Sequence, residues 1–216
     1  MTDIILIGSG GCMRELAWQI HESNRIEEKW NIIGYVDTKE PVNGYGIRVG
    51  TEVIPYLGND NNLIRADEDK NVVISVGSSK LRKKIAEEYR KNPRIHFPAV
   101  VLRPSYVCYD AKMGQGCIVS MDCRISTNVK MGDFVFMNMG GMVCHDGMLE
   151  DFVTLGPTVK IAGMVRVGEN TEIGMGANLI QGISVGANTV IGAGSVVIRD
   201  VERDCMAAGV PARVRG

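Results

Sequence analysis

The spacing of hydrophobic residues changes near residue 104, and this change divides the chain into two parts. Before it, short aliphatic runs alternate with segments whose apolar residues recur at helical spacing. The runs predict three strands, at Ile4–Ile7, Asn31–Val36 and Val72–Val76. The segments predict two helices, at Met13–Ile20 and Lys80–Lys91. Strand, turn and helix repeated in this order predict a small, parallel, Rossmann-like α/β domain over residues 1–100.

The second part follows a six-residue pattern. From Val107, residues 107–202 divide into sixteen hexads, and each begins with Val, Ile, Leu or Met. The fifth position is always Ala, Cys, Val, Gly, Ile, Ser or Thr. Such regularity identifies an internal repeat, which is typical of a parallel β-helix, and in hexapeptide-repeat proteins that helix is left-handed. We therefore expect an all-β left-handed parallel β-helix over residues 101–216, with a C-terminal cap.

Each hexad predicts a short strand and a turn, with the first residue facing inward. Three hexads make one triangular coil, so residues eighteen apart stack at a spacing of about 4.8 Å. A bare prism of this kind exposes flat faces and unpaired end coils. Trimer formation and a terminal cap are the usual protection of such edges, and we expect a homotrimer.

The carboxyl ends of the predicted strands are where a ligand of the α/β domain would lie. The first strand is followed by the turn Gly8–Gly11, which has the G-x-G of a dinucleotide fingerprint but Met13 in place of its third glycine. This turn is consistent with phosphate binding or with close helix packing. Asp37 ends the second strand, where an acid commonly meets a ribose hydroxyl, although a plain turn aspartate also fits.

Composition narrows the class of protein. The chain has 216 residues, 45% hydrophobic and 23% charged, with a formal net charge of −1. This balance gives no electrostatic reason to expect nucleic acid or an anionic membrane as partner. No run of eighteen apolar residues predicts a membrane span, and the N-terminus is a poor signal peptide, so we expect a cytoplasmic protein. Six cysteines lack C-x-x-C or zinc-finger spacing and are expected as reduced thiols: Cys12, Cys108, Cys117, Cys123, Cys144 and Cys205.

The candidate chemistry lies in the hexad Val143–Met148. His145 takes its third position, a corner from which side chains leave the coil, and Asp146 follows it. An imidazole beside a carboxylate is the usual arrangement of a general base, although a solvated turn histidine also fits. Asn138 stands seven residues earlier, and Cys144 is an alternative nucleophile that we interpret as a packing residue. The repeat needs none of Asn138, His145 and Asp146, which is the argument for chemistry.

Several motifs together resemble a known family. They are the turn I-L-I-G-S-G-G, the hexapeptide β-helix, N-x6-H-D and the ending A-A-G-V-P-A-R-V. The combination resembles the sialic acid and bacillosamine O-/N-acyltransferases, which are sugar acetyltransferases of bacterial surface-glycan synthesis and often act on UDP-linked amino sugars. The resemblance covers nearly the whole chain. It implies an acetyl-CoA-dependent acetyltransferase of a UDP-linked amino sugar that uses no metal.

The resemblance also implies roles for individual residues. His145 would be the general base, Asp146 would orient its imidazole, and Asn138 would line the same pocket. The nucleotide sugar would be held by Gly8, Ser9, Gly10, Gly11, Asp37, Gly77 and Ser78. Coenzyme A would lie between neighbouring prisms against Thr154, Gly156, Gly163, Gly174, Gly176, Gly192, Gly194 and Pro211.

The chemistry agrees with these roles. Amines are mostly protonated at neutral pH, so acyl transfer to an amine needs a base with a pKa near 7, as a histidine has. Backbone N–H groups of a glycine-rich turn would stabilise the oxyanion. No acyl-enzyme is required, so we expect direct transfer in a ternary complex.

The chain departs from the family where many members have His-Gly in place of Cys12 and Met13, and a histidine in place of Thr154. These departures concern the sugar-nucleotide and acetyl-CoA contacts. Three rival interpretations remain: a metal hydratase, which would need three histidines near the prism surface; a simple O-acetyltransferase, which would not need the α/β domain; and a non-catalytic sugar-nucleotide-binding trimer. Transfer to nitrogen or oxygen, and the identity of the sugar, stay open.

Overall fold

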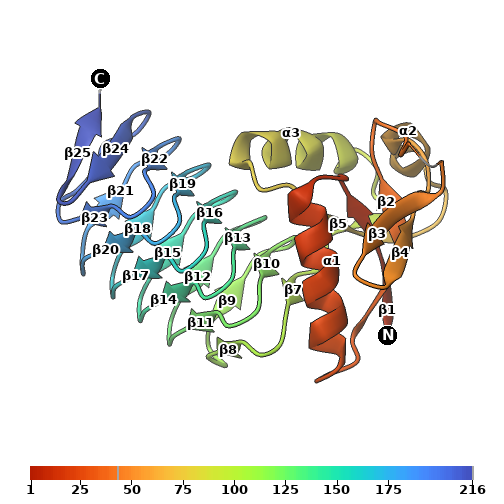
Figure 1. Ribbon diagram of the computed structural model, residues 1–216. Coiled ribbons are helices and arrows are strands. Elements are labelled where there is room, and N and C mark those ends of the chain that lie inside the picture. Colours follow the sequence, from red (N-terminus) through yellow and green to blue (C-terminus); the bar gives the residue numbers. More distant parts are fainter. Residues whose placement is uncertain (43, 216) are drawn as a thin grey trace. The chain divides into compact units, whose positions relative to one another are not determined.

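The computed structural model describes residues 1–42 and 44–215. The chain folds into two compact units (Figure 1). Unit 1 consists of Met1–Gly77 and Leu81–Pro98, and unit 2 consists of Ser78–Lys80 and Ala99–Gly216. Each unit has its own sheet architecture and is described separately.

Unit 1 is built on a four-stranded parallel sheet in the order β2-β1-β5-β6. Its strands are β1 (Thr2–Ile7), β2 (Trp30–Val36), β5 (Lys70–Ile74) and β6 (Ile95–His96). Its other elements are α1 (Gly11–Asn24), the antiparallel hairpin of β3 (Gly46–Val49) and β4 (Glu52–Pro55), α2 (Asp60–Ile64) and α3 (Ser79–Tyr89). The aliphatic run of β1 is buried, and α1 buries its apolar stripe. The predicted parallel α/β fold is confirmed.

The third predicted strand is shorter than expected. It was expected to reach Val76, whereas β5 ends at Ile74. The reason is that β1 ends at Ile7, whose carbonyl accepts both the N–H of Ser75 at 3.0 Å and its hydroxyl at 2.7 Å. After Ile7 the chain leaves the sheet, because Gly8 turns away with φ +106°, and β1 therefore offers β5 no further backbone partner.

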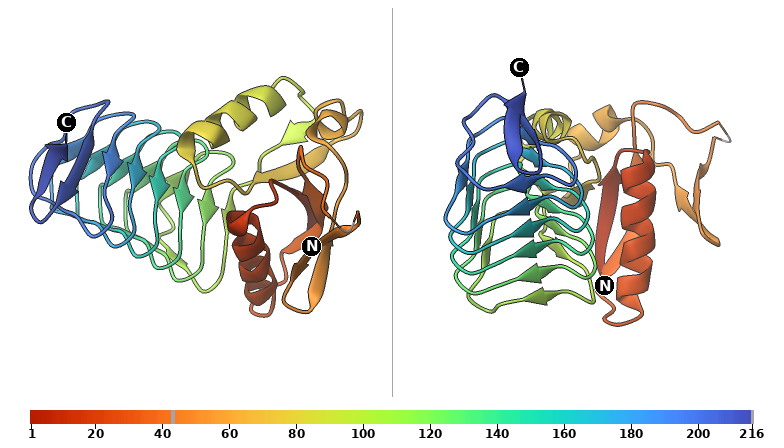
Figure 2. Two further views of the ribbon diagram at one scale, coloured as in Figure 1. Left: turned by 45° about the horizontal axis from the view of Figure 1, so that its top comes forward. Right: turned by 60° about the vertical axis from the view of Figure 1, so that its left-hand side comes forward.

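Unit 2 is a solenoid of about six coils with three parallel faces (Figures 1 and 2). Face 1 contains β7 (Val100–Val101), β10 (Ile118–Val119), β13 (Phe136–Met137), β16 (Thr154–Leu155), β19 (Glu172–Ile173), β22 (Val190–Ile191), β24 (Met206–Gly209) and β25 (Ala212–Arg215). Face 2 contains β8 (Tyr106–Val107), β11 (Arg124–Ile125), β14 (Met142–Val143), β17 (Lys160–Ile161), β20 (Asn178–Leu179) and β23 (Val196–Val197). Face 3 contains β9 (Lys112–Met113), β12 (Lys130–Met131), β15 (Met148–Leu149), β18 (Arg166–Val167) and β21 (Ser184–Val185).

The hexad register predicted from the sequence is confirmed. In every two-residue strand from β8 to β23, the second residue is the aliphatic residue at the first position of a hexad. Neighbouring strands pair with a shift of eighteen residues, as Val143 does with Ile161. These aliphatics form one core along the axis, each contributing about 1.5–3 kcal/mol when fully buried. The repeat begins one hexad earlier than expected, at Val101, because Pro104 interrupts the pattern only within a turn.

Three columns of stacked turns form the corners of the prism. The glycine corner, between faces 1 and 2, contains the turns at 121–122, 139–140, 157–158, 175–176 and 193–194. The histidine corner, between faces 2 and 3, contains those at 109–110, 127–128, 145–146, 163–164 and 181–182. The asparagine corner, between faces 3 and 1, contains those at 115–116, 133–134, 151–152, 169–170, 187–188 and 203–204.

The fourth hexad position is left-handed in almost every turn, and this explains its many Gly, Asn and Asp residues. Even Phe134 and Phe152 adopt it, with φ of 55° and 60°, and their rings stack 5.2 Å apart. The solenoid ends where β24 continues face 1 and β25 folds back antiparallel onto it (Figure 2). This hairpin covers the last coil, as a C-terminal cap would.

Candidate active site

The histidine corner brings the imidazole and the adjacent carboxylate into contact. Along a strand, consecutive side chains point to opposite sides, but Asp146 has φ +59° and therefore turns back toward its neighbour. His145 Nδ1 lies 2.8 Å from Asp146 Oδ2. Both side chains are about half exposed, at 47% and 46%. The pair therefore faces solvent in a single chain.

The other oxygen of Asp146 is held by the preceding coil. Asn128 Nδ2 donates to Asp146 Oδ1 at 2.7 Å, and Asp146 N–H donates to the Thr127 carbonyl at 3.1 Å. The hydrogen bond from Asn128, followed by that from His145, holds the pKa of Asp146 below its ordinary value. The carboxylate is therefore ionised at neutral pH and acts as an acceptor.

The following coil lies directly against the imidazole. Gly163 is buried at the position eighteen residues after His145, and a Cβ built on it would overlap Cε1 and Nε2 of the ring. Only glycine therefore leaves room for the imidazole in this orientation. Within the described part of the chain, no group accepts a hydrogen bond from the Gly163 N–H. One backbone donor is thus available beside the ring.

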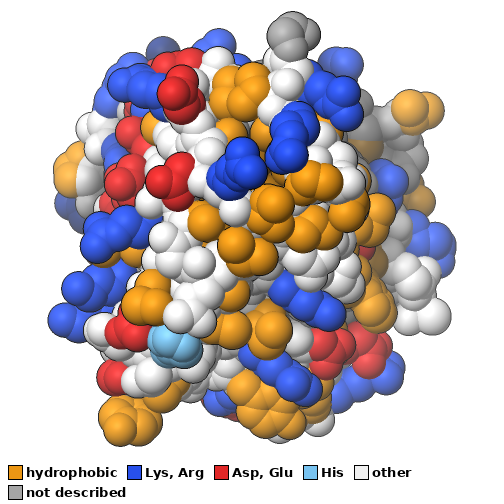
Figure 3. Space-filling model, turned by 90° about the vertical axis from the view of Figure 1, so that its left-hand side faces the viewer, with side chains coloured by type: hydrophobic (Ala, Val, Ile, Leu, Met, Phe, Trp, Pro, Cys, Tyr) orange, Lys and Arg blue, Asp and Glu red, His pale blue; other side chains and the backbone are white. Residues whose placement is uncertain are grey.

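A groove on face 2 begins next to this corner. It encloses about 420 Å³ and is lined by Met142, Cys144, Lys160, Ile161, Ala162, Asn178, Leu179, Ile180 and Gln181. Its lining is mostly apolar and contains one cation, Lys160. Figure 3 shows a histidine beside hydrophobic side chains on one face of the molecule. The groove therefore offers a mostly apolar surface that reaches the histidine corner at Cys144 and Gln181.

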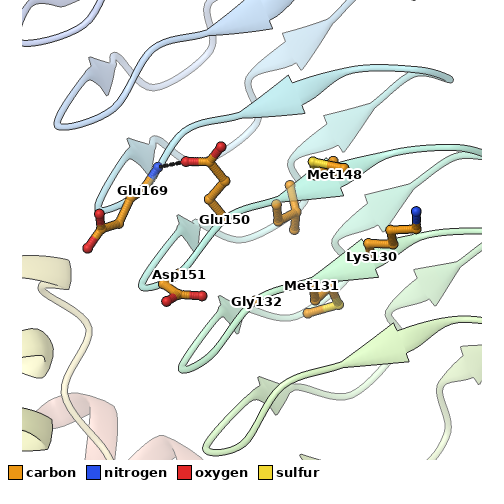
Figure 4. Close-up of a pocket in the computed structure, with 8 residues that line it drawn as sticks. Lys130, Met131, Gly132, Met148, Glu150, Asp151 and Glu169 are labelled. Carbon is orange, nitrogen blue, oxygen red and sulfur yellow. Dashed lines mark hydrogen bonds between the residues drawn. The ribbon is translucent and has the colours of Figure 1, made fainter.

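A second hollow, on face 3, has a different character (Figure 4). It encloses about 390 Å³ and is lined by Lys130, Met131, Gly132, Met148, Leu149, Glu150, Asp151 and Glu169. Two of its carboxylates accept hydrogen bonds from backbone N–H groups. Glu150 accepts the Glu169 N–H at 3.0 Å, and Asp151 accepts the Asp133 N–H at 2.8 Å. Three carboxylates against one ammonium disfavour an anionic ligand, so this hollow does not suit the phosphates of coenzyme A.

The residues expected to bind coenzyme A lie in several separate places on the solenoid. Thr154 lies on β16 of face 1, Gly163 in the histidine corner, and Pro211 in the turn between β24 and β25. The remaining five share the glycine corner: Gly156, Gly174, Gly176, Gly192 and Gly194. Packing alone explains some of them, because a Cβ at Gly174 would lie 2.9 Å from the Ala193 Cα.

Asn138 is also separated from His145 within one chain. It precedes the turn 139–140 of the glycine corner, and its Oδ1 accepts the Met139 N–H at 2.7 Å. Face 2 lies between this corner and the imidazole. A shared pocket of Asn138 and His145 therefore stays a prediction that requires a second copy of the chain.

Most residues expected to hold the nucleotide meet at one edge of the unit 1 sheet. Gly8 N–H donates to the Val36 carbonyl at 2.9 Å, which joins the ends of β1 and β2. Burial alone would raise the pKa of Asp37, but hydrogen bonds from Ser9, Lys39 and Thr38 outweigh it and lower that pKa. The carboxylate of Asp37 is therefore largely engaged by its own loop and by the glycine turn.

Gly10 and Gly11 start helix α1, which has no side-chain cap on its first N–H groups, so these donors favour an anion. Gly77 follows β5 at the same edge, whereas Ser78 is grouped with unit 2. A hollow of about 450 Å³ beside the turn is lined by Ser9, Tyr35, Lys39, Glu40, Pro41, Val42, Gly46, Ile47 and Arg48. The hollow and the uncapped N–H groups of α1 both lie near the turn where the nucleotide is expected.

The chain resembles known proteins in both units. Residues 3–89 match the PglD N-terminal domain, and residues 164–199 match the bacterial transferase hexapeptide family of six repeats. A GDP-perosamine N-acetyltransferase of Escherichia coli is 34% identical over 112 residues, which is 50% of this chain and 49% of that protein. The chain spans about half the length of this curated relative.

Two solved structures are similar over nearly their whole length. One is a histidine-to-alanine mutant of GDP-perosamine N-acetyltransferase from Caulobacter crescentus in complex with CoA and GDP-perosamine, with 29% identity, a TM-score of 0.85 and coverage of 100% of this chain and 98% of that one. The other is the acetyltransferase domain of PglB from Neisseria gonorrhoeae in complex with acetyl coenzyme A, with 25% identity, a TM-score of 0.87 and coverage of 99% and 98%. The chain is therefore similar to sugar acetyltransferases in both of its units.

The predicted resemblance to hexapeptide-repeat sugar acetyltransferases, with a PglD-type N-terminal domain, is thus confirmed. Residues 1–42 and 44–215 contain no helix that is both long and apolar enough to cross a membrane. The same residues contain no group of three or more His, Cys, Asp or Glu side chains arranged for a metal ion.

Two residues that support the candidate sites were not predicted from the sequence. Asn128 contacts Asp146, and counting back eighteen residues from Asp146 would have found it. Arg82 is 1% exposed and donates to the Val76 and Gly77 carbonyls at 3.0 Å each, which fixes the chain after β5. No sequence signal marks Arg82, because it is one of several charged residues on an amphipathic helix.

Proposed function

We propose that the chain is an acetyl-CoA-dependent N-acetyltransferase of a nucleotide-linked amino sugar, with His145 as the general base. The observation that carries the proposal is the corner itself: an imidazole held by a carboxylate on one side, with a free backbone donor on the other. The similarity to sugar acetyltransferases with CoA, acetyl coenzyme A or GDP-perosamine bound supports it.

The carboxylate sets the role of each imidazole nitrogen. Because ionised Asp146 can only accept, the neutral ring carries its proton on Nδ1 and leaves Nε2 as the acceptor. Nε2 takes a proton from the sugar amine as its nitrogen attacks the thioester carbonyl. The C–N bond forms, the tetrahedral intermediate collapses with cleavage of the C–S bond, and the imidazolium returns the proton to the leaving thiolate. The products are the sugar amide and free CoA.

The oxyanion of that intermediate needs a donor close to the base. The Gly163 N–H is buried, has no acceptor among the described residues, and belongs to the residue against which the ring lies. A preorganised donor of this kind typically contributes 10²–10³ in kcat. Gly163, which the sequence analysis placed in the coenzyme A site, would thus serve the reacting carbonyl itself.

The acyl donor site is incomplete in one chain. The apolar groove of face 2 starts beside His145, whereas the glycine corner and Asn138 lie on the other side of that face. In a homotrimer the glycine corner of one copy would approach the histidine corner of the next, so that coenzyme A would lie between two prisms. Assembly into a trimer is therefore part of the proposal.

The nucleotide carrier we propose is GDP. UDP was expected from the sequence, but one curated relative is a GDP-perosamine N-acetyltransferase, and a similar solved structure holds GDP-perosamine. The edge of unit 1 formed by the glycine turn, the start of α1 and Asp37 would hold the nucleotide. A role in surface-glycan synthesis follows from such a substrate and is proposed with it.

The proposal is tested by following thiol release from acetyl-CoA with GDP-linked and UDP-linked amino sugars as parallel acceptors. We expect turnover with the GDP-linked amino sugar and its loss by a factor of roughly 10²–10⁴ in His145→Ala. The absence of turnover with every acceptor, together with no binding of CoA in the presence of either nucleotide, would overturn the proposal. Equal function of wild type and His145→Ala would favour the non-catalytic trimer instead.

A hydroxyl acceptor is the second candidate. A serine acetyltransferase of Synechococcus elongatus is 36% identical over 114 residues, which cover 48% of this chain and 39% of that protein. The same corner could deprotonate a hydroxyl, since the base and the oxyanion donor serve both reactions. Serine and a hydroxy sugar belong in the acceptor panel, and turnover with them alone would select this candidate.

A further inference from the structure

The carboxylate beside His145 has a second, independent partner. Asp146 contacts the imidazole through Oδ2 and the amide of Asn128 through Oδ1, at 2.8 Å and 2.7 Å. One carboxylate thus has each oxygen held by a different coil of the solenoid. With both oxygens held, the carboxylate plane cannot rotate without breaking a hydrogen bond.

The orientation of the Asn128 amide follows from chemistry. An ionised carboxylate has no proton to donate, so the amide nitrogen and not the amide oxygen must face it. The hydrogen bond from Asn128 is also the largest cause that lowers the pKa of Asp146. Asn128 therefore stabilises the charged form that accepts the Nδ1 proton of the imidazole.

The coil before Asn128 fixes the backbone of this residue in turn. Asp110 accepts the backbone N–H of Asn128 at 3.1 Å and the hydroxyl of Thr127 at 2.6 Å. Asn128 itself is in the left-handed conformation, with φ +53°. Three successive coils are thus linked from Asp110 through Asn128 to Asp146 and His145.

We propose that Asn128 is a positioning residue of the active site, which acts through Asp146 to hold His145 in the Nδ1–H tautomer with Nε2 free. This inference rests on the proposed function and extends it to a residue that never touches the substrate. The charged groups around Asn128 are Asp110 at its backbone N–H, Asp146 at its side-chain amide and, through Asp146, His145.

The asparagine corner offers a matched control. Asn188 has φ +56° and donates to Asp204 Oδ1 at 2.9 Å, while the neighbouring Arg203 donates to Asp204 Oδ2 at 2.7 Å. This arrangement has the same backbone and the same amide-to-carboxylate hydrogen bond but no histidine. If the Asn128 hydrogen bond only stabilises the solenoid, the two asparagines will behave alike.

The first test needs no substrate. Nitrogen-15 NMR of the full chain reports the tautomer of each histidine, and His145→Ala assigns the signal of His145 among the three. Glycine keeps the left-handed turn and removes the amide, so Asn128→Gly is compared with Asn188→Gly. We expect the first to convert the His145 signal from the Nδ1–H form to a mixture of tautomers, and the second to leave it unchanged. An unchanged His145 signal in Asn128→Gly overturns the inference.

The second test is kinetic. With acetyl-CoA and the accepted sugar, Asn128→Gly is expected to lower kcat roughly 10- to 100-fold, because a misplaced base costs up to 10²-fold, and to leave KM for acetyl-CoA within about twofold. In an Asp146→Asn background the same substitution should lower kcat no further, since its effect passes through Asp146. An equal loss in both backgrounds would show a structural role.

Two further observations keep the result interpretable. If Asn128→Gly does not fold, Asn128→Ala replaces it, because that variant also removes the amide donor and adds no charge beside Asp110 and Asp146. If the wild type transfers acetyl to no acceptor, the proposed function fails while the tautomer experiment still decides the role of Asn128.

Discussion

The histidine corner and the asparagine corner carry the same three-part arrangement. In each, an asparagine amide donates to one oxygen of a carboxylate in the next coil, and the residue before that carboxylate binds its other oxygen. In both, hydrogen bonding by the asparagine is the largest cause that lowers the pKa of the acid. Within this three-part arrangement the corners differ in one residue type, since His145 stands where the other corner has Arg203.

This difference shows which part of the site is general and which is chemical. The left-handed turn and the eighteen-residue stacking generate the arrangement wherever Asn and Asp fall in register. A guanidinium stays protonated at any physiological pH and cannot act as a base, whereas an imidazole exchanges its proton near neutrality. At the histidine corner the next coil also supplies a glycine, which leaves space for the ring and a free N–H. Catalysis thus requires more than the shared geometry.

Removal of the two side chains that differ between the corners should produce the largest contrast. His145→Ala is expected to lower kcat by roughly 10²–10⁴, because the amine loses its base. Arg203→Ala removes the matching contact to Asp204 and should leave kcat within about twofold. Steady-state thiol release measures both variants, and a loss below about threefold in His145→Ala would contradict a base at this position.

Substitution of the carboxylate beside the imidazole should have the next largest effect on kcat. Asp146→Asn is expected to lower kcat roughly 10- to 100-fold, because the imidazole loses the acceptor that orients it. The lowered pKa of Asp146 means that its carboxylate is charged above its ordinary titration range and loses that charge only as the pH falls through the lowered value. The wild type should therefore keep its advantage in kcat over Asp146→Asn from about pH 6 to pH 9, because Asp146 stays charged there. Disappearance of that advantage within this window would show that another group sets the effect.

The glycine beside the ring should have a smaller effect, measured as stability. Gly163→Ala inserts a methyl group where the imidazole lies, and overpacking of this kind typically costs about 1–3 kcal/mol. In a His145→Ala background the space is empty, so the same substitution should cost little. Denaturant unfolding of the four chains measures this coupling. Equal costs in both backgrounds would mean that the ring does not lie against Gly163.

The cysteine next to the imidazole should have the smallest effect. Cys144→Ser is expected to keep kcat within about twofold, because direct transfer forms no acyl-cysteine. Buried Cys123 provides the matched thiol: burial raises its pKa to about 12, so it should resist alkylation while Cys144 reacts. Burst kinetics or an acetylated Cys144 seen by mass spectrometry would support a covalent route instead.

Sequence periodicity predicted the solenoid well because its constraint repeats. Each first-position aliphatic must face the core, so the register of Val143 or Leu149 follows from counting. The α/β unit was predicted less fully: its parallel sheet was found, but the β3–β4 hairpin and α2 were not. Local turns and short helices carry weak patterns, since few of their residues are buried. Within the site, adjacency in sequence revealed the His145–Asp146 pair, whereas Asn128 is adjacent only in space.

By itself, the sequence determined the hexad register, the inward aliphatics and the presence of one histidine–aspartate pair at a corner, because these depend on residue order and on a fixed period. Only the tertiary structure decided that Asp146 turns back to the imidazole, that Asn128 holds its other oxygen, and that Gly163 lies under the ring. It also showed that Asn138 and His145 occupy different corners of one chain. Asp146 turns back through its left-handed backbone, whereas Asn128 and Gly163 reach the pair through the stacking of successive coils, which brings together residues eighteen positions apart.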